Sequence, residues 1–258
     1  MSDPLVLFEL SDDGIATLTL NRPDKMNAFT MEMLGVWNEL LQKCAEDPNV
    51  KAIVLTGAGS AFCAGGDANA MKTRAGNDAL EQKNFLWKHI HSIALTLDRL
   101  DKPMIAAING VARGAGLDMA LMCDIRVMAA SATLAESYIS MGLIAGDGGT
   151  WYLPRLVGLD RALELLWTGR TVASDEALRI GMVTQVVPDD RILSDTYDFV
   201  RTICAQPPEA IRLYKRAVYQ SYRMELPAHL DMLSSHMSVL RDSPEHRERV
   251  SRFLARKN

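Results

Sequence analysis

The amino-acid sequence predicts an α/β protein built around a mostly parallel sheet. Stretches rich in β-branched and apolar residues alternate with stretches whose apolar residues recur at helical spacing, which is typical of strands joined by helices. Two glycine-rich segments follow such strands, and the strand signal disappears after about residue 190. A chain of 258 residues is long enough to bury a substantial core.

The first predicted elements are a hairpin, a helix and a buried strand. Residues 5–10 and 15–20 flank the turn sequence SDDG, which indicates an antiparallel hairpin. After the loop NRPDKMNAF, residues 31–47 have apolar side chains at helical spacing, and the pattern ends before Pro48. The apolar run VKAIVLTG then predicts a strand buried on both faces, so the chain begins as a βαβ unit.

The same pattern then recurs. A glycine-rich loop at 57–66 precedes a long helical stretch near 77–100, and the strand PMIAAING leads to a glycine-rich turn at Gly114 and Gly116. The helix LDMALMC and the strand DIRVMAA follow. Each loop comes after a parallel strand, so the loops are expected at the carboxyl ends of the strands, where α/β proteins bind ligands.

Helices are predicted for the C-terminal part of the chain. They lie in PEAIRLYKRAVYQSY, AHLDMLSSHMSVLRD and SPEHRERVSRFLARKN. Ser243 is placed to cap the last of them, and Pro244 suits its first position. We therefore divide the chain into an α/β core at 1–195 and a helical region at 196–258 that is expected to take part in oligomer formation.

Composition argues against several classes of function. Apolar residues make up 48% and charged residues 23%, as in soluble globular proteins, and a net charge of −4 offers no basic face for nucleic acid. No window approaches the roughly 18 apolar residues of a membrane span, and the N-terminus resembles no leader, so a cytoplasmic protein without membrane or nucleic-acid partners is expected. The cysteines lie far apart, without metal-ligand spacing, and no metal is expected.

The two glycine-rich loops are candidates for stabilising a negative oxygen. Ala61–Asp67 and Ala112–Gly116 each follow a strand and precede a predicted helix, whose first N–H groups are unpaired and carry the positive end of the dipole. Two converging N–H groups would form an oxyanion hole. Neither loop matches the dinucleotide fingerprint, and no Walker loop is present. Taken singly, each loop is equally compatible with an ordinary glycine turn, with Asp67 as a helix cap.

Several segments together resemble one family. NRPDKMNAF, AFCAGGD, PMIAAINGVARGAGLDMALMCDIRV and MGLIAGDGGTWYLPRLVG, in this order, resemble the enoyl-CoA hydratase/isomerase (crotonase) family, and the resemblance covers essentially the whole chain. It implies a crotonase-like spiral of repeated ββα units with a helical C-terminal region, usually assembled as a homotrimer or a dimer of trimers. It also implies an acyl-CoA thioester as the substrate, as in fatty acid metabolism, and no cofactor besides the coenzyme A that belongs to the substrate.

The resemblance also assigns site residues. The oxyanion donors fall on the backbone N–H groups of Gly66 and Ala115. Contacts to coenzyme A, mostly through the main chain, fall on Lys25, Asn27, Ala28, Ala64, Gly65 and Asp67. Candidate residues of the acyl pocket are Met71 and Trp87.

The acid and base differ from those of typical family hydratases, which have a glutamate at each of two positions. The first position is Asp118, whose carboxylate is shorter by one methylene, and the second is Tyr138, a phenol that is a poor base at neutral pH. Asp147 lies in the next loop, close to where family isomerases carry a single carboxylate. Asp118, Tyr138 and Asp147 are therefore the candidate catalytic residues.

Other interpretations of these residues stay open. Asp118 also suits a first helical turn, Asp147 a tight turn, and Tyr138 the wall of an acyl pocket. Glu136 is interpreted as a carboxylate on the surface or behind the site. The five histidines are interpreted as structural or exposed.

The sequence thus predicts an enzyme that acts on an acyl-CoA thioester through an enolate held by backbone N–H groups. Either hydration of a 2-enoyl-CoA or a double-bond shift fits, and the shift needs only one carboxylate. The alternatives are a catalytically weak protein that binds coenzyme A thioesters and a hydrolase or decarboxylase of the same family.

Overall fold

A six-stranded sheet forms the centre of the computed structural model, which describes residues 3–67 and 78–255. Its strand order is β1-β2-β3-β5-β7-β10, and only the β1–β2 pair is antiparallel. The strands are β1 (Val6–Leu10), β2 (Ile15–Leu20), β3 (Ala52–Gly57), β5 (Met104–Ile108), β7 (Ile125–Ala129) and β10 (Gln185–Val187). The predicted hairpin and parallel strands are confirmed.

A second sheet contains four short strands in the order β4-β6-β8-β9. They are β4 (Ala61–Cys63), β6 (Val111–Arg113), β8 (Thr133–Ala135) and β9 (Val172–Ala173). Each of β3, β5 and β7 is followed by one of these strands, so the chain winds through repeated ββα units as the resemblance implied. The glycine-rich segments predicted as loops therefore each contain a short strand.

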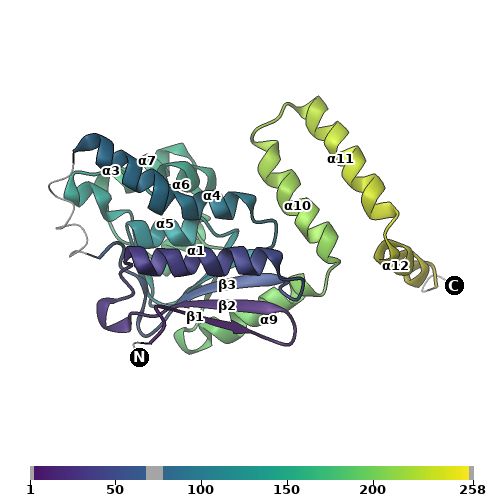
Figure 1. Ribbon diagram of the computed structural model, residues 1–258, viewed down its shortest axis with the longest axis horizontal. Helices are drawn as coiled ribbons and strands as arrows, with labels where there is room; N and C mark the ends of the chain where they lie inside the picture. Colours follow the sequence, from purple (N-terminus) through teal and green to yellow (C-terminus); the bar gives the residue numbers. More distant parts are fainter. Residues whose placement is uncertain (1–2, 68–77, 256–258) are drawn as a thin grey trace.

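Helices surround the two sheets (Figure 1). In the first half they are α1 (Met31–Glu46), α3 (Ala79–Phe85), the π-helical turn η2 (Leu86–Ile90), α4 (His91–Arg99) and α5 (Ala115–Leu121). Next come α6 (Gly149–Val157), α7 (Leu159–Thr168), α8 (Ser174–Arg179) and α9 (Ile192–Cys204). The 3-10 helices include η1 (Pro23–Lys25) and η3 (Ser137–Met141). Helix α1 begins where the Thr30 hydroxyl accepts the Met33 N–H and ends before Pro48, as predicted.

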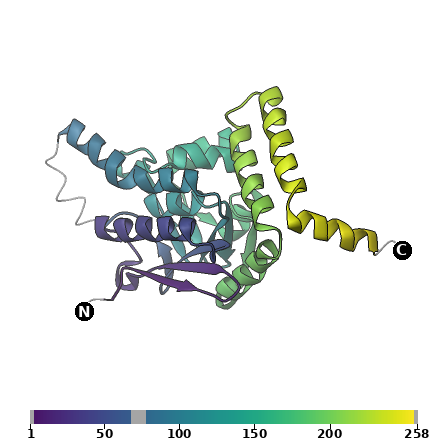
Figure 2. The same cartoon turned by 45° about the vertical axis from the view of Figure 1, so that its right-hand side comes forward.

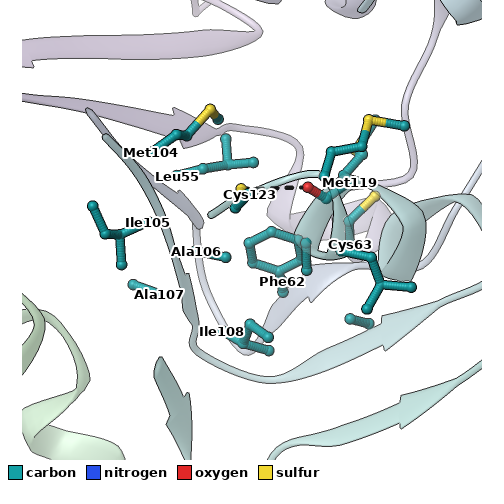
Figure 3. Close-up of a cluster of buried hydrophobic side chains, with 14 of the residues drawn as sticks. Leu55, Phe62, Cys63, Met104, Ile105, Ala106, Ala107, Ile108, Met119 and Cys123 are labelled. Carbon is teal, nitrogen blue, oxygen red and sulfur yellow. Dashed lines mark hydrogen bonds between the residues drawn. The ribbon is translucent and has the colours of Figure 1, made fainter. Parts of the chain in front are cut away.

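The core lies between the sheets and α5. Every residue of β3 and β5 is buried, which explains why these strands are continuous apolar runs in the sequence. Figure 3 shows the fully buried ring of Phe62, from β4, among side chains of β5 and α5. This packing fixes β4 relative to α5, and the candidate site lies at the ends of these two elements.

The C-terminal helices α10 (Pro208–Ser221), α11 (Leu226–Arg241) and α12 (Pro244–Ala255) match the predicted ones. Ion pairs such as Lys215–Asp124 at 2.8 Å join α10 to the core, whereas α11 and α12 contain no buried residue and extend away from it (Figures 1 and 2). Ser243 caps α12 as predicted, accepting the His246 N–H at 3.2 Å.

The predicted domain boundary after residue 195 falls inside α9, a helix that packs against β5 and β7. The division into two regions stays a prediction. Among the helices that the structure describes, none combines the length and apolar character needed to cross a membrane.

Candidate active site

The candidate site lies where the strands of the second sheet end. Parallel pairing places β6 between β4 and β8, so the segments that follow these strands emerge side by side. These segments carry Gly66, Ala115 and Tyr138, and the loop before α6 adds Asp147. Residues that lie up to 81 positions apart in the sequence are thus brought to one edge of the sheet.

The N–H groups of Gly66 and Ala115 belong to two loops in close contact. A side chain at Gly65 would lie 3.1 Å from the Arg113 carbonyl oxygen and 3.8 Å from the Ala115 nitrogen, and one at Gly116 would collide with the Cys63 backbone. Within the described residues, neither the Gly66 nor the Ala115 N–H donates a backbone hydrogen bond. Ala115 is the first residue of α5, where no preceding turn supplies an acceptor.

Asp118 lies in the first turn of α5 and is fully buried. Its Oδ2 accepts a hydrogen bond of 2.8 Å from the Tyr138 hydroxyl. Burial raises the pKa of Asp118 to about 7; the bond from Tyr138 opposes this rise and the negative charge of Asp147 adds to it. A carboxyl group with such a pKa exchanges protons readily near neutral pH.

Tyr138 lies in η3, and its ring packs against Gly114, directly before the Ala115 N–H. Burial, followed by the charge of Asp118, raises the pKa of Tyr138 far above that of a free phenol. Tyr138 therefore stays a neutral hydrogen-bond donor at physiological pH, and its hydroxyl is directed at a carboxylate. The structure thus brings together two of the three candidate catalytic side chains.

Glu136 lies behind Asp118, which is one of the two places expected for it. It is 2% exposed and so not on the surface, and its Oε1 borders the same space beside Gly149 as Oδ1 of Asp118. Its backbone (φ −82°, ψ 74°) leaves the strand geometry, and η3 begins at the next residue. Burial and then the Asp118 charge raise the pKa of Glu136 to about 10.

Asp147 lies half-buried in the loop that leads to α6. Its charge contributes to the raised pKa values of Asp118, Glu136 and Tyr138, so it belongs to the same electrostatic cluster. The preceding residue, Gly146, contacts helix α4, because Nε2 of His91 lies 2.9 Å from the Gly146 carbonyl oxygen. That contact, across 55 residues of sequence, could not be read from local pattern.

A rigid loop at 22–29 borders the glycine-rich segment. Asn27 is fully buried with a φ of 56°, its Oδ1 accepts the Arg22 N–H at 2.9 Å, and its Nδ2 donates to the carbonyls of Ala58 and Ala61. Arg22 also pairs with Asp67 at 2.9 Å. The side chains of Asn27 and Asp67 thus hold the loop in place, a role that the sequence did not predict.

The other matched residues differ in accessibility. Lys25 is exposed and Ala28 is half-buried, whereas the Ala64 N–H already donates to the Met26 carbonyl at 2.9 Å. Trp87 is 62% exposed on η2 and contacts the ring of His91 edge to face. Met71 lies outside the described residues. The predicted contacts of these residues with coenzyme A and the acyl chain stay predictions.

The combination of a ββα spiral, two neighbouring glycine-rich loops and a buried carboxyl group at one sheet edge can be compared with known proteins. The sequence profile of the enoyl-CoA hydratase/isomerase family matches residues 11–258. The chain belongs to this family. As predicted from its motifs, it is an enoyl-CoA hydratase/isomerase-type enzyme, and the geometry leaves the subtype open.

Individual members of the family include both lyases and isomerases. The chain is 35% identical to 1,2-epoxyphenylacetyl-CoA isomerase of Escherichia coli (strain K12), over 96% of this chain and 94% of that protein. It is 30% identical to short-chain-enoyl-CoA hydratase of Clostridium acetobutylicum, over 94% and 92%. The crystal structure of an enoyl-CoA hydratase from Mycobacterium smegmatis superposes with a TM-score of 0.92 at 33% identity, covering 98% of this chain and 97% of that one.

Metal ligation finds no support in residues 3–67 and 78–255, because no three His, Cys, Asp or Glu side chains there are grouped to hold an ion. The expectation that the enzyme needs no cofactor stays a prediction.

Proposed function

We propose that this enzyme shifts a carbon–carbon double bond within an acyl-CoA thioester, with Asp118 as the group that carries the proton. The observation that supports this proposal is the buried Asp118 carboxyl, one turn after the Ala115 N–H, with a pKa of about 7. A group that must act first as a base and then as an acid works best with a pKa near the working pH.

The proposed reaction starts from a 3-enoyl thioester. The Asp118 carboxylate removes a proton from carbon 2, the electrons move through a dienolate onto the thioester oxygen, and the protonated Asp118 returns the proton to carbon 4. The double bond thereby moves to carbons 2 and 3. In this proposal the N–H groups of Gly66 and Ala115 hold the negative oxygen, and removing one such donor typically lowers the rate about 10²–10³-fold.

Tyr138 favours a double-bond shift over hydration. Hydration requires one group to activate water and another to protonate carbon, and the second glutamate position holds a phenol whose pKa is raised. Its hydroxyl already donates to Asp118. Tyr138 is therefore proposed to orient Asp118 rather than to activate water.

Hydration is the second candidate function, and one observation favours it. The charge of Asp147 reaches Asp118 strongly enough to raise its pKa. A second carboxyl group is thus near the first, as a water-adding site would need. In that case Asp147 would activate the water and Asp118 would protonate carbon 2.

We propose that the coenzyme A portion lies along the loop at 22–29 and the segment at 64–67. The contacts of Asn27 and the Arg22–Asp67 pair hold these segments in place, so their main chain is ordered before the ligand arrives. The exposed Lys25 side chain at the rim is suited to the phosphates of coenzyme A.

We also propose that the protein assembles as a homotrimer or a dimer of trimers. Helices α11 and α12 bury no residue, and large apolar side chains on α11 are at least half exposed, namely Leu226, Leu230, Met237 and Val239. Leu226, Leu230 and Met237 lie on one face of α11, and an apolar helical face of this kind favours association. Sedimentation equilibrium tests this, and a monomer at micromolar concentration would overturn it. A cytoplasmic location without nucleic-acid or membrane partners stays a prediction.

The function is tested by offering the purified protein a 3-enoyl-CoA and a 2-enoyl-CoA in separate reactions and analysing the products by chromatography and mass spectrometry. We expect interconversion of the two isomers without a water adduct. An adduct formed from the 2-enoyl substrate would show hydration instead, and no change of either substrate would overturn both functions. Asp118→Asn should abolish the shift, whereas Asp160→Asn, in the exposed first turn of α7, should not change it.

A further inference from the structure

Three carboxyl oxygens in the site have no hydrogen-bond partner. They are Oδ1 of Asp118 and both oxygens of Glu136, each shielded from solvent and without a partner among the described residues. Buried polar atoms are rarely left unpaired, because losing water without a replacement costs free energy. The site therefore lacks a hydrogen that these oxygens could share.

Gly149 shows how close the two acids lie. A side chain on Gly149 would place its β-carbon 2.7 Å from Oε1 of Glu136 and closer still to Oδ1 of Asp118. The two oxygens thus border the same small space, and only glycine leaves it open. Two ionised carboxylates cannot occupy such a space at low cost, because they repel each other and neither has a hydrogen to donate.

We propose that Glu136 is protonated in the working enzyme and donates its hydrogen to Oδ1 of Asp118, so that it positions the proton-carrying carboxylate as a neutral partner. The role in positioning rests on the function proposed above, whereas the protonation itself does not. With this hydrogen in place, Asp118 has a donor on each oxygen, Glu136 on Oδ1 and Tyr138 on Oδ2. This hydrogen joins Oδ1 of Asp118 to one oxygen of Glu136, so that, among the described residues, only the second oxygen of Glu136 is left without a partner.

The surroundings of the pair favour this assignment of the proton. Facing it are the phenol of Tyr138 from η3, the Asp147 carboxyl from the next loop and the phenol of Tyr152 from α6. Burial, followed by the charge of Asp118, raises the pKa of Glu136 to about 10. Asp118, with a pKa of about 7, therefore loses its proton first.

The positions of the two residues support the same division of roles. Asp118 is within one turn of the proposed oxyanion donor Ala115, whereas Glu136 directly follows β8. Glu136 is therefore a positioning residue that acts through Asp118. A glutamine at this position would keep a neutral N–H donor, so the proposal predicts that Gln replaces Glu with little loss.

The protonation is tested without substrate by infrared spectroscopy, at a pH between the two pKa values. The wild-type protein should show the C=O stretch of a neutral carboxyl group, which shifts in D₂O, and Glu136→Gln should remove it. Glu248→Gln, which removes an exposed carboxylate of α12, should leave the band unchanged. Absence of the band from the wild-type protein, or its persistence in Glu136→Gln, would overturn the proposal.

The positioning role is tested by the pH dependence of kcat/KM. Glu136→Gln should keep the rate within roughly threefold, because the amide still donates to Asp118. Glu136→Leu should move the midpoint of the acidic limb upward by about one unit and lower kcat/KM at neutral pH roughly tenfold, because the carboxylate loses a donor. An unmoved midpoint, or equal losses in both variants, would contradict the role. If Glu136→Leu does not fold, the rate of Glu136→Gln decides, and a loss much larger than roughly threefold would contradict the role.

The two proposals can fail separately. A neutral carboxyl band that depends on Glu136, in a protein that converts neither enoyl-CoA, would support the protonated pair and refute the double-bond shift. A working isomerase without that band would do the opposite.

Discussion

Substituting Gly149 with alanine should disable the acid cluster although it replaces no ionisable group. The new β-carbon would lie 2.7 Å from Oε1 of Glu136, 2.9 Å from the β-carbon of Ala145 and within collision distance of Oδ1 of Asp118. Such contacts require the two carboxyl side chains to move apart by an appreciable part of an ångström. Overpacking of this kind in a buried site costs about 1–3 kcal/mol of stability.

The effect on the reaction should exceed the effect on stability. A displacement of a catalytic group by about 1 Å can lower the rate on the order of 10²-fold, because the proton then has to travel from a misplaced oxygen. We therefore expect kcat to fall roughly 30- to 100-fold, with KM for the enoyl-CoA changed less than threefold. Urea unfolding in parallel with isomerase kinetics measures both effects.

A matched glycine provides the control. Gly35 lies within α1 with nothing near its missing β-carbon, so Gly35→Ala should stabilise the protein by roughly 0.5–1 kcal/mol and leave kcat unchanged. If Gly149→Ala retained full activity, the space between Asp118 and Glu136 would not be as tight as the structure shows. The inferred hydrogen between them would then lose its geometric basis.

Three further predictions follow from the site. Asp118→Asn should lower kcat at least about 10²-fold and Asp147→Asn much less, as steady-state assays will show; the reverse order would assign the proton transfer to Asp147. Asn27→Ala removes three side-chain hydrogen bonds, so it should lower the free energy of unfolding in urea on the order of 3 kcal/mol and raise KM more than it lowers kcat. Asn49→Ala, at an exposed turn, should change neither the stability nor the kinetics. The pKa values of Asp118 and Glu136 are raised on folding, so the native state holds more protons than the unfolded chain and the free energy of unfolding should fall as the pH rises. The fall should begin near the ordinary carboxyl pKa of about 4, become shallower above the Asp118 pKa of about 7 and end near the Glu136 pKa of about 10. Glu136→Gln should flatten that slope by up to about 1.4 kcal/mol per pH unit, and equal slopes would contradict the assignment.

Much of the fold could be predicted because long buried strands and helices leave a recognisable apolar pattern in the sequence. The strands β3 and β5 are apolar on both faces, and α1 has a cap, a helical apolar period and a proline after its end, so each leaves a strong signal. The three-residue strands β4, β6 and β8 leave none, since three residues are too few to display alternation. The sequence therefore predicts β4 and β6 only as parts of the glycine-rich loops, and it predicts no element at β8.

The site could be predicted only in part, because some of its residues lie in recognisable motifs and others are placed by tertiary contacts. Gly66, Ala115 and Asp118 lie in motifs whose order along the chain carries the family resemblance. For Glu136 the sequence left both a surface position and a position behind the site open, because only the tertiary structure brings its carboxyl group to the same space as that of Asp118. The contact of His91 with Gly146 depends on tertiary structure alone, because no local pattern links residues of α4 to a loop 55 positions away.

Asn27 and the Arg22–Asp67 pair hold the loop at 22–29, while Asp118, Glu136, Tyr138 and Asp147 influence one another in the acid cluster. Under the proposed function, the coenzyme A portion of the substrate and its reacting carbons meet separate sets of residues. Substitutions in the acid cluster are then expected to change the reaction while the protein continues to bind the same kind of thioester, which would make this chain a suitable scaffold for redirecting enolate chemistry.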